Sequence, residues 1–474
     1  MKLLWLSIRT RILSLFFLGL FISVALTPGQ ANAAPNYPLK LSPNGLHLVD
    51  QTNQPFFMNG DSAWSLISQL SQADADAYLS DRAQKGFNLV LVNLIEHKFA
   101  TNAPANLAGQ VPFAAAGDFS APVEAYFAHA DWVIKKAAEK GIVVLLAPIY
   151  LGYDCGSEGW CSDVKSSSLA TMRSYGRYVG NRYKNFPNII WLIGGDADPV
   201  ANGVAAKLRE FVAGVREVDT GHLMTAHNAR NQAAMDVWTT DSWLDINNIY
   251  TSGSEYQAAL TQYNRTGAKP FFLLESNYEN QAGITPLNLR QQAYWSVLSG
   301  GIVGHIFGNC PMWHFNAPST SSFCTGSTWK SQLNSTGSIT LAHVGRLFLS
   351  RAFYLLVPDQ AHSVLTAGFQ SGTSYAAAAR ASDGSSVIAY IPTNRTVTID
   401  LTKIAGASVR AWWFNPRTAV ATLINTYPAS GTKTFTPPDS NDWVLVLDNA
   451  SLNLPAPGAL SQAPAAPTNL RVVS

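Results

Sequence analysis

Between residues 55 and 309 the chain alternates short apolar runs with longer amphipathic stretches. The apolar runs are rich in branched residues, which favours strands buried on both faces of a parallel sheet. Eight such runs lie at residues 55–61, 87–97, 142–150, 188–196, 222–227, 245–250, 270–276 and 301–308. The amphipathic stretches predict helices near residues 72–85, 121–140, 167–185, 201–217, 255–266 and 287–299, and a short one near 233–240.

Helix boundaries support this alternation. Ser71 followed by Asp74 resembles a capping box, and Gly86 and Gly141 each follow a lysine where a helix is expected to end. Eight βα units within about 300 residues predict a (β/α)8 barrel, the TIM-barrel architecture. A doubly wound open sheet is the alternative, although neither a Gly-x-Gly-x-x-Gly loop nor a P-loop follows the first strand.

After residue 357 the pattern changes to period-two strands separated by turns. The strand candidates lie at residues 374–380, 385–392, 396–401, 409–416, 432–438 and 442–448, and they predict a small all-β sandwich. The predicted fold class is therefore α/β, with a (β/α)8 barrel at residues 34–357 and a C-terminal β-sandwich at 358–449. Residues 450–474 form a Pro- and Ala-rich tail.

The first 33 residues have the features of a secretory signal peptide. Three basic residues precede the apolar run at 12–26, and Ala31–Ala33 is a small-x-small cleavage pattern. We therefore expect a secreted or periplasmic protein without a membrane span after cleavage; an uncleaved anchor is the alternative. Without the leader, 29 basic residues face 30 acidic ones and form no basic cluster, which excludes nucleic acid as a partner.

Four cysteines follow the leader as two local pairs, Cys155 with Cys161 and Cys310 with Cys324. In an oxidising compartment these predict two loop-closing disulfides, each contributing about 2–3 kcal/mol. A zinc site is the rival interpretation, but neither Cys-x-x-Cys nor His-x-x-x-His spacing surrounds them. We expect no metal or organic cofactor.

Polar residues follow seven of the eight apolar runs, and catalytic groups of barrel enzymes lie at the carboxyl ends of strands. Asp196 and Glu275 end the fourth and seventh runs. Glycoside cleavage needs one carboxylic acid to protonate the leaving oxygen and one carboxylate to act as nucleophile or to activate water. Aromatic walls for a sugar are available in the loops at Trp64, Tyr150, Tyr153, Trp160, Tyr250, Tyr278 and Trp313.

We assign catalysis to Asp196 and Glu275. Substrate binding is assigned to the polar and aromatic residues Asp61, Trp64, Glu96, His97, Tyr150, His227, Tyr250, His305 and Trp313.

Each assignment has a plainer structural alternative. Asp196 could cap a turn or helix, although Asp198 is the better cap, and Glu275 could form a buried ion pair with an arginine. Asp61 and Glu96 could tune neighbouring pKa values, supply the nucleophile or be structural. The three histidines could be interior residues, and Trp64 could simply pack against the core.

The adjacent tryptophans Trp412 and Trp413 would lie on opposite faces of a strand. They therefore predict one ring in the sandwich core and one against the barrel, in preference to a sugar-binding platform.

Four segments in this order resemble the apiosidase-like glycoside hydrolases of family 140. They are PFFMNGDSAW from residue 55, DADAYLSDRAQKGFNLVLVNLIE from 74, NIIWLIGGD from 188 and PFFLLES from 270, within a resemblance that spans residues 40–448. The resemblance implies a (β/α)8 barrel with a C-terminal sandwich, sometimes labelled a "putative collagen-binding domain". It also implies release of the branched pentose apiose from pectic rhamnogalacturonan II.

The same resemblance matches Asp196 to the acid/base and Glu275 to the nucleophile. Many related barrel glycosidases carry Asn-Glu on the fourth strand, so the shorter aspartate here implies that the substrate binds deeper. The collagen-binding label finds no support in the residues of the C-terminal module.

These observations predict a secreted, monomeric glycoside hydrolase that cleaves a plant or microbial polysaccharide with retention of configuration. Inversion is the alternative, since carboxyl groups about 5–5.5 Å apart imply retention and about 6.5–9.5 Å imply inversion. A non-catalytic carbohydrate-binding or adhesion protein on a barrel scaffold is the rival function. A peptidase is less well supported, because the chain lacks His-Glu-x-x-His and Gly-x-Ser-x-Gly.

Overall fold

The computed structural model describes residues 35–318, 324 and 328–459. The predicted signal peptide at residues 1–33 and the end of the predicted tail, 460–474, lie outside the described residues.

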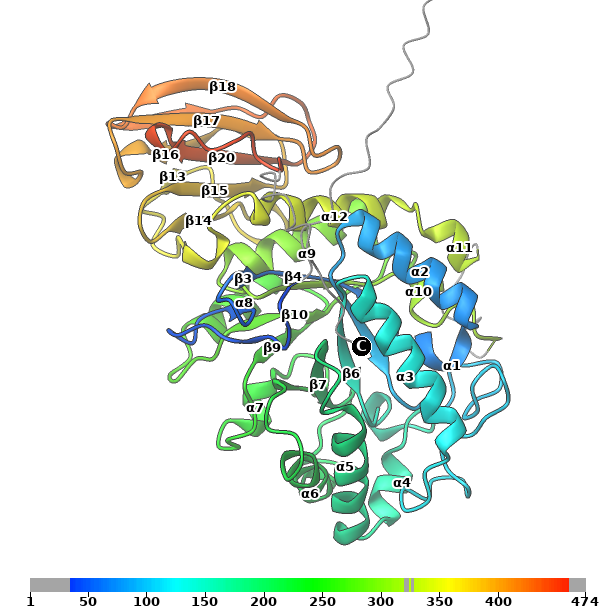
Figure 1. Cartoon of the computed structure of the whole chain (residues 1–474). Coiled ribbons are helices and arrows are strands. Elements are labelled where there is room, and N and C mark those ends of the chain that lie inside the picture. Colours follow the sequence, from blue (N-terminus) through cyan, green and yellow to red (C-terminus); the bar gives the residue numbers. More distant parts are fainter. Residues whose placement is uncertain (1–34, 319–323, 325–327, 460–474) are drawn as a thin grey trace, which may run out of the picture. The chain divides into compact units, whose positions relative to one another are not determined.

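Each of the eight predicted runs contains a strand of one parallel sheet (Figure 1). In chain order these are β4 (Met58–Ser62), β5 (Leu89–Asn93), β6 (Val143–Ala147), β7 (Ile189–Gly194), β8 (Met224–His227), β9 (Asn247–Tyr250), β10 (Phe271–Glu275) and β11 (Gly304–Phe307). Their order in the sheet is β8-β7-β6-β5-β4-β11-β10-β9.

Strands β8 and β9 meet without a regular ladder, and a few side-chain and backbone bonds link them. The Asn248 amide of β9 donates to Thr225 Oγ1 at 2.9 Å and to the Ala226 carbonyl at 2.6 Å on β8. The Asp245 N–H, just before β9, donates to the Met224 carbonyl at 3.0 Å. The sheet is thus a nearly closed barrel, which confirms the predicted barrel and rules out the open doubly wound alternative.

The seven predicted helices are present and surround the strands (Figure 1). They are α2 (Gln72–Lys85), α3 (Glu124–Glu139), α5 (Leu169–Tyr183), α6 (Ala205–Arg216), α7 (Ala234–Trp238), α8 (Glu255–Tyr263) and α9 (Pro286–Leu298). Ser71 caps α2 by accepting the Asp74 N–H at 3.2 Å, and Gly86 ends it at a positive φ of 86°.

Among the described residues, five further α-helices lie outside the predicted set: α1 (Leu66–Gln69), α4 (Cys161–Ser166), α10 (Cys310–Trp313), α11 (Trp329–Gln332) and α12 (Thr336–Leu349). The long helix α12 follows β11 and completes the ring of major helices. Among the described helices, none combines the length and the apolar surface that crossing a bilayer requires.

Strand residues alternate between the barrel interior and the helices. Leu89 and Leu91 of β5 belong to the interior core, whereas Val90 and Val92 pack with the helices. A short antiparallel sheet of β1 (Lys40–Leu41), β2 (Leu48–Val49) and β3 (Pro55–Phe56) adds apolar side chains to the same interior core. We therefore expect the active site at the opposite end of the barrel, where the parallel strands have their carboxyl termini.

The C-terminal region consists of two antiparallel sheets, which confirms the predicted all-β module. One sheet has the order β12 (Leu356–Pro358), β14 (Ala377–Ala381), β15 (Ser386–Ile391), β20 (Trp443–Asn449), β17 (Ser408–Phe414) and β18 (Ala421–Pro428). The other has the order β13 (Leu365–Ala367), β16 (Val397–Asp400) and β19 (Thr432–Phe435). Trp413 lies in the sandwich core, while Trp412 packs against the core shared with the barrel helices, as the alternation predicted.

Two buried ion pairs fix this module to the barrel. Arg290 of α9 donates to both oxygens of Asp442 at 2.7 and 2.8 Å, and Arg351 after α12 donates to both oxygens of Asp448 at 2.8 and 2.7 Å. All four side chains are 6% exposed or less. Loss of Arg351 would leave the buried Asp448 without its ion pair, whereas Asp442 would keep Arg417 at 3.4 Å after loss of Arg290.

Candidate active site

Asp196 and Glu275 are brought together around the imidazole of His227. His227 ends β8 and Glu275 ends β10, while Asp196 lies two residues beyond β7. Nε2 of His227 lies 2.8 Å from Glu275 Oε2, and Nδ1 accepts the backbone N–H of Asp196 at 3.0 Å. Three neighbouring parts of the sheet thus present these groups at the same end of the barrel.

A β-bulge directs Glu275 toward this group. In β10, Phe272 and Leu274 point into the barrel and Leu273 points to the helices, so simple alternation would turn Glu275 toward the helices as well. The pairing with β9 shifts between Leu273 and Glu275, which places an extra residue in β10. Such a bulge re-aims the following side chain, and here Glu275 meets His227.

The carboxyl group of Asp196 has the environment of a weak acid. Tyr250 donates to its Oδ1 at 3.0 Å and Tyr150 to its Oδ2 at 3.3 Å. Burial raises the pKa of Asp196 to about 6, and the nearby negative charge of Glu275 adds to the rise, although His227 and Tyr250 oppose it. A substantial fraction of Asp196 is therefore protonated in mildly acidic solution.

The backbone of Asp196 is held in an unusual conformation. Its φ of 53° lies in the left-handed region, which costs a non-glycine residue about 1–3 kcal/mol. The N–H bond to His227 and a bond of 2.9 Å from the Asp154 N–H to the Asp196 carbonyl hold it there.

The carboxylate of Glu275 is held by two side chains. His227 lies at one oxygen, and the Tyr278 hydroxyl donates to the other at 2.8 Å. The Trp64 indole donates to the Tyr278 oxygen at 3.1 Å, which orients that hydroxyl toward Glu275. The Glu275 side chain is 12% exposed, so these bonds stabilise an anion that has little water around it.

Aromatic rings line the same region. Trp64 lies 5.6 Å from Tyr150 and 5.6 Å from His227, and Tyr250 lies 5.0 Å from His227, measured between ring centroids. Trp313 packs in the same apolar cluster as Trp64, with its ring 5.0 Å from that of Phe99. A sugar ring is bound well by such apolar faces.

Two of the other aromatic candidates do not share this arrangement. Tyr153 is 62% exposed in the loop after β6, and Trp160 is buried, with its ring 5.7 Å from that of Phe113.

Two residues of the site fall outside the sequence-based assignment. Tyr278 was recognised only as one of several loop aromatics, and Arg230 was missed. Arg230 donates to the Tyr250 hydroxyl at 3.3 Å, and its guanidinium lies 5.5 Å from the centre of the Tyr250 ring. Both residues occur three positions after a strand-ending site residue, His227 or Glu275, and that spacing is the signal that could have identified them.

Asp61 and His305 are turned away from this site, which corrects their assignment to sugar binding. Asp61 is fully buried and bonds to Arg82 at 3.0 Å and to Tyr78 at 2.8 Å, both on α2. His305 faces Phe57 on the helix side of β11, and burial lowers its pKa to about 3, so it is a neutral interior residue. Both residues lie at positions of their strands that face the helices, while Met58 of β4 and Ile306 of β11 face the interior core.

Glu96 and His97 also have structural partners. One oxygen of Glu96 accepts the backbone N–H groups of residues 97–99 at 2.9–3.2 Å, and the other accepts the Ser65 hydroxyl at 3.0 Å. The ring of His97 packs edge-on against Trp160 at 4.7 Å. Glu96 therefore organises its own loop, and the geometry does not bring His97 to Glu275.

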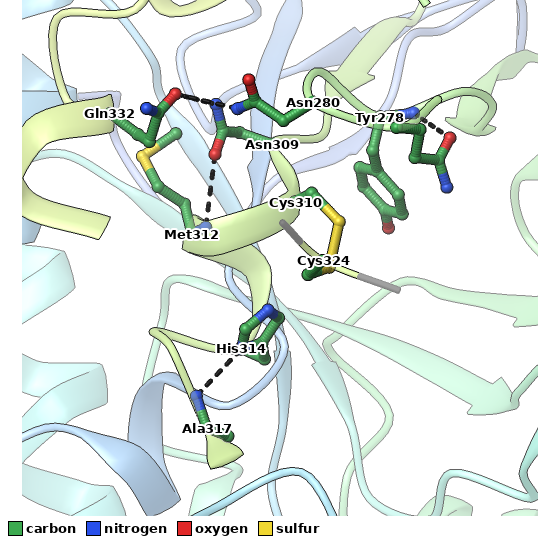
Figure 2. The surroundings of a disulfide bond; sticks show 10 residues. Tyr278, Asn280, Asn309, Cys310, Met312, His314, Ala317, Cys324 and Gln332 are labelled. Atoms are coloured by element: carbon green, nitrogen blue, oxygen red, sulfur yellow. Dashed lines mark hydrogen bonds between the residues drawn. A yellow bond between two sulfur atoms is a disulfide. The ribbon is translucent and has the colours of Figure 1, made fainter. Parts of the chain in front are cut away.

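Both predicted disulfides are present, with Cα–Cα distances of 5.2 Å each. The Cys310–Cys324 bond lies beside the loop that carries Tyr278 (Figure 2). Backbone bonds of 2.9 and 2.8 Å join Glu279 of that loop to Gly308 and Cys310. A side chain at Gly308 would overlap the Tyr278 ring, so glycine is required for this close approach.

Within the described ranges, no three His, Cys, Asp or Glu side chains are placed to share a metal ion. The ionisable residues of the site are instead bonded to one another.

Two known family models match the chain. The model described as "Apiosidase-like, catalytic domain" matches residues 42–354. A second model, "Putative collagen-binding domain of a collagenase", matches residues 357–448. No curated protein has significant sequence similarity to the chain.

Solved structures share the fold. One described as "Glycoside hydrolase" is 24% identical with a TM-score of 0.77, and the match covers 88% of this chain and 98% of that chain. A glycoside hydrolase family 5 structure from Bacteroides vulgatus ATCC 8482 is 24% identical with a TM-score of 0.79, covering 90% and 96% respectively. Given the family match over most of the barrel, the chain belongs to the apiosidase-like family and is a glycoside hydrolase.

Proposed function

We propose that the protein is a secreted, retaining glycoside hydrolase in which Asp196 is the acid/base and Glu275 the nucleophile. The observation that carries this proposal is the pairing of a carboxyl group whose pKa is raised to about 6 with a carboxylate that accepts two side-chain hydrogen bonds. Both are bonded to His227. An acid and a base held in contrasting environments at one site are what glycoside cleavage requires.

In the first step, Glu275 forms a bond to the anomeric carbon as the glycosidic C–O bond breaks. Protonated Asp196 gives its proton to the departing oxygen, so the leaving group departs as a neutral alcohol. The weaker tyrosine bond is at Oδ2, at 3.3 Å against 3.0 Å at Oδ1, which makes Oδ2 the oxygen more readily protonated.

In the second step, ionised Asp196 removes a proton from water. The water oxygen attacks the anomeric carbon and releases Glu275 as a carboxylate. Two displacements at one carbon return the original configuration.

For the substrate, the proposal is a plant or microbial polysaccharide from which a terminal pentose of the apiose type is released. The apiosidase-like family match supports this substrate class, and the aromatic wall around Trp64, Tyr150 and Tyr250 supports binding of a sugar ring. Secretion is supported by the two disulfides, which persist in oxidising compartments.

The first test uses the variants Asp196→Asn and Glu275→Gln, with Asp198→Asn as the matched control. Asp198 lies two residues from Asp196 but caps the following turn, accepting the N–H groups of Val200 and Ala201. We expect Glu275→Gln to abolish turnover, Asp196→Asn to lower kcat by about 10²–10⁴-fold, and Asp198→Asn to remain active. Near-full activity of either site variant would remove the role assigned to it.

The second test identifies substrate and stereochemistry. The protein is incubated with pectic rhamnogalacturonan II, arabinan and other plant glycans, and the released sugars are separated. With the glycan that is cleaved, NMR of the first product anomer should show the configuration of the substrate. An inverted product would exclude the covalent step at Glu275.

A further inference from the structure

Every polar atom of the His227 side chain is used inside the protein. The residue is 1% exposed, with Nε2 facing Glu275 and Nδ1 facing two backbone groups. These are the N–H of Asp196 at 3.0 Å and the carbonyl of Asn228 at 2.9 Å. The sequence-based assignment of His227 to sugar binding is therefore not favoured, since neither nitrogen points away from the protein.

The two neighbours of Nδ1 require opposite protonation states. The Asp196 N–H can donate only to an unprotonated Nδ1, and the Asn228 carbonyl can accept only from a protonated one. With Nδ1 unprotonated, a neutral imidazole carries its hydrogen on Nε2 and donates it to Glu275. In that tautomer His227 bonds to the proposed nucleophile and to the backbone of the proposed acid simultaneously.

Protonation of His227 would break this link. An imidazolium donates from Nδ1 to Asn228 and leaves the Asp196 N–H without its acceptor. Asp196 is the residue with φ of 53°, so it would lose one of the bonds that hold its left-handed backbone.

Three titratable groups contact the ring: Glu275 on β10, Asp196 after β7 and Tyr250 on β9. Each of these has a further titratable or charged partner, Tyr278 at Glu275, Tyr150 at Asp196 and Arg230 at Tyr250. Burial alone lowers the pKa of His227. The hydrogen bond and charge of Glu275, with the charge of Asp196, outweigh burial and raise the pKa above its ordinary value. Acidic solution therefore favours the imidazolium.

The geometry points to His227 as a positioning residue that, in its neutral Nε2–H form, holds the Glu275 carboxylate and the Asp196 backbone in one working arrangement. This inference rests on the proposed roles of Asp196 and Glu275. It separates two functions of one ring, a donor at Nε2 for the nucleophile and an acceptor at Nδ1 for the acid.

Two variants divide these functions. His227→Gln keeps an amide donor near the Nε2 position but loses the acceptor for Asp196. His227→Asn keeps an acceptor near the Nδ1 position but loses the donor to Glu275. The matched control is His222→Gln, because His222 is also buried and pairs with a carboxylate, Asp219, at 2.8 Å, near the other end of β8.

Activity is measured on aryl apiosides with good and poor leaving groups. A displaced acid matters only when the leaving group needs a proton, so His227→Gln should lower kcat/KM about 10²-fold for the poor leaving group and much less for the good one. His227→Asn should lower kcat/KM similarly for both. Because neither variant carries a titrating imidazole, the limb of the pH profile that arises from His227 should be absent in both.

The inference is overturned if both His227 variants show leaving-group-independent losses and keep both limbs of the wild-type pH profile, as expected for His222→Gln. Circular dichroism and urea unfolding establish that each variant is folded.

An activity-independent measurement separates this inference from the proposed function. NMR of the wild-type protein labelled with ¹⁵N-histidine, with His227 assigned by its loss in the variants, should show a protonated Nε2 and a bare Nδ1 at the alkaline pH where the ring is neutral. The reverse tautomer would overturn the inference even if Asp196 and Glu275 prove catalytic. Full activity of Glu275→Gln would overturn the proposed function but not this tautomer.

Discussion

Replacing Asp196 with Asn should stabilise the protein at neutral pH while removing most of its activity. The pKa of Asp196 is raised from 3.8 to about 6, chiefly by burial, so the folded protein disfavours the ionised carboxylate. A pKa raised in the folded state means that ionisation costs stability at pH above about 6. That cost shrinks as the pH falls from about 6 to 3.8 and is absent below 3.8.

The magnitude follows from the two pKa values. Each tenfold change in acidity corresponds to about 1.4 kcal/mol, so the difference between 3.8 and about 6 is worth up to about 3 kcal/mol. Asn has nearly the same shape, and its carbonyl oxygen can still accept the bond that Tyr250 donates at 3.0 Å. The expected gain is therefore the electrostatic cost of the anion, without a new cavity.

The assay is urea unfolding of wild type and Asp196→Asn from about pH 4 to about pH 8, where the gain in unfolding free energy should grow with pH. Asp198→Asn is the control. Burial raises the pKa of Asp198, but hydrogen bonds from Ala201, Gln232 and Val200 outweigh this and lower it. The control should thus gain nothing at neutral pH. The raised pKa of Asp196 would be refuted if Asp196→Asn gave no gain in unfolding free energy, or the same gain at about pH 4 and about pH 8. The reason for assigning Asp196 as the acid would then be lost as well.

Three further outcomes are expected. Because Asp196, with a pKa of about 6, must be protonated to act as the acid while the inferred role of His227 requires a neutral ring, the pH profile of kcat/KM should be bell-shaped, and a profile flat from pH 5 to 8 would contradict the assignment of Asp196. Tyr278→Phe removes a donor to the proposed nucleophile and should lower kcat/KM about 10- to 100-fold, whereas Tyr183→Phe, at a buried hydroxyl without a hydrogen-bond partner, should not. Arg351→Ala leaves the buried carboxylate of Asp448 without its ion pair, so urea unfolding should show a loss of about 3–5 kcal/mol, and a loss below about 1 kcal/mol would mean that the pair behaves like an exposed one.

The main elements of the fold follow from local sequence pattern. The eight apolar runs each contain a barrel strand, and the seven amphipathic stretches each contain a helix. These features depend on period and length, which are visible in a single sequence. Helix α12 was not predicted, although Ser335 caps it, because the predicted helices all lie between strands and α12 follows the last strand of the barrel. Strand β18 was missed because its surface is largely exposed and carries little apolar signal.

The site was harder to predict, because a residue's place near a strand end does not give the direction of its side chain. Asp61 and His305 were selected for the same reason as Glu275, yet both point to the helices. Alternation along their strands could have shown this, since Met58 and Ile306 identify the inward positions. Alternation correctly places Trp412 and Trp413 on opposite faces of β17, and the same rule along the barrel strands turns Asp61 and His305 toward the helices.

Alternation would nevertheless have misplaced the two residues proposed to be catalytic. Applied strictly, it turns Glu275 toward the helices, and only the bulge in β10 brings its carboxylate to His227. Asp196 lies beyond β7, and its left-handed backbone conformation sets where its carboxyl group points. Both carboxyl groups are thus positioned by departures from regular structure that bonds to neighbouring strands maintain. Rules of strand alternation and helix period predict the scaffold well. They fail at Asp196 and Glu275, because the backbone departs from regular strand geometry where the two carboxyl groups are brought together.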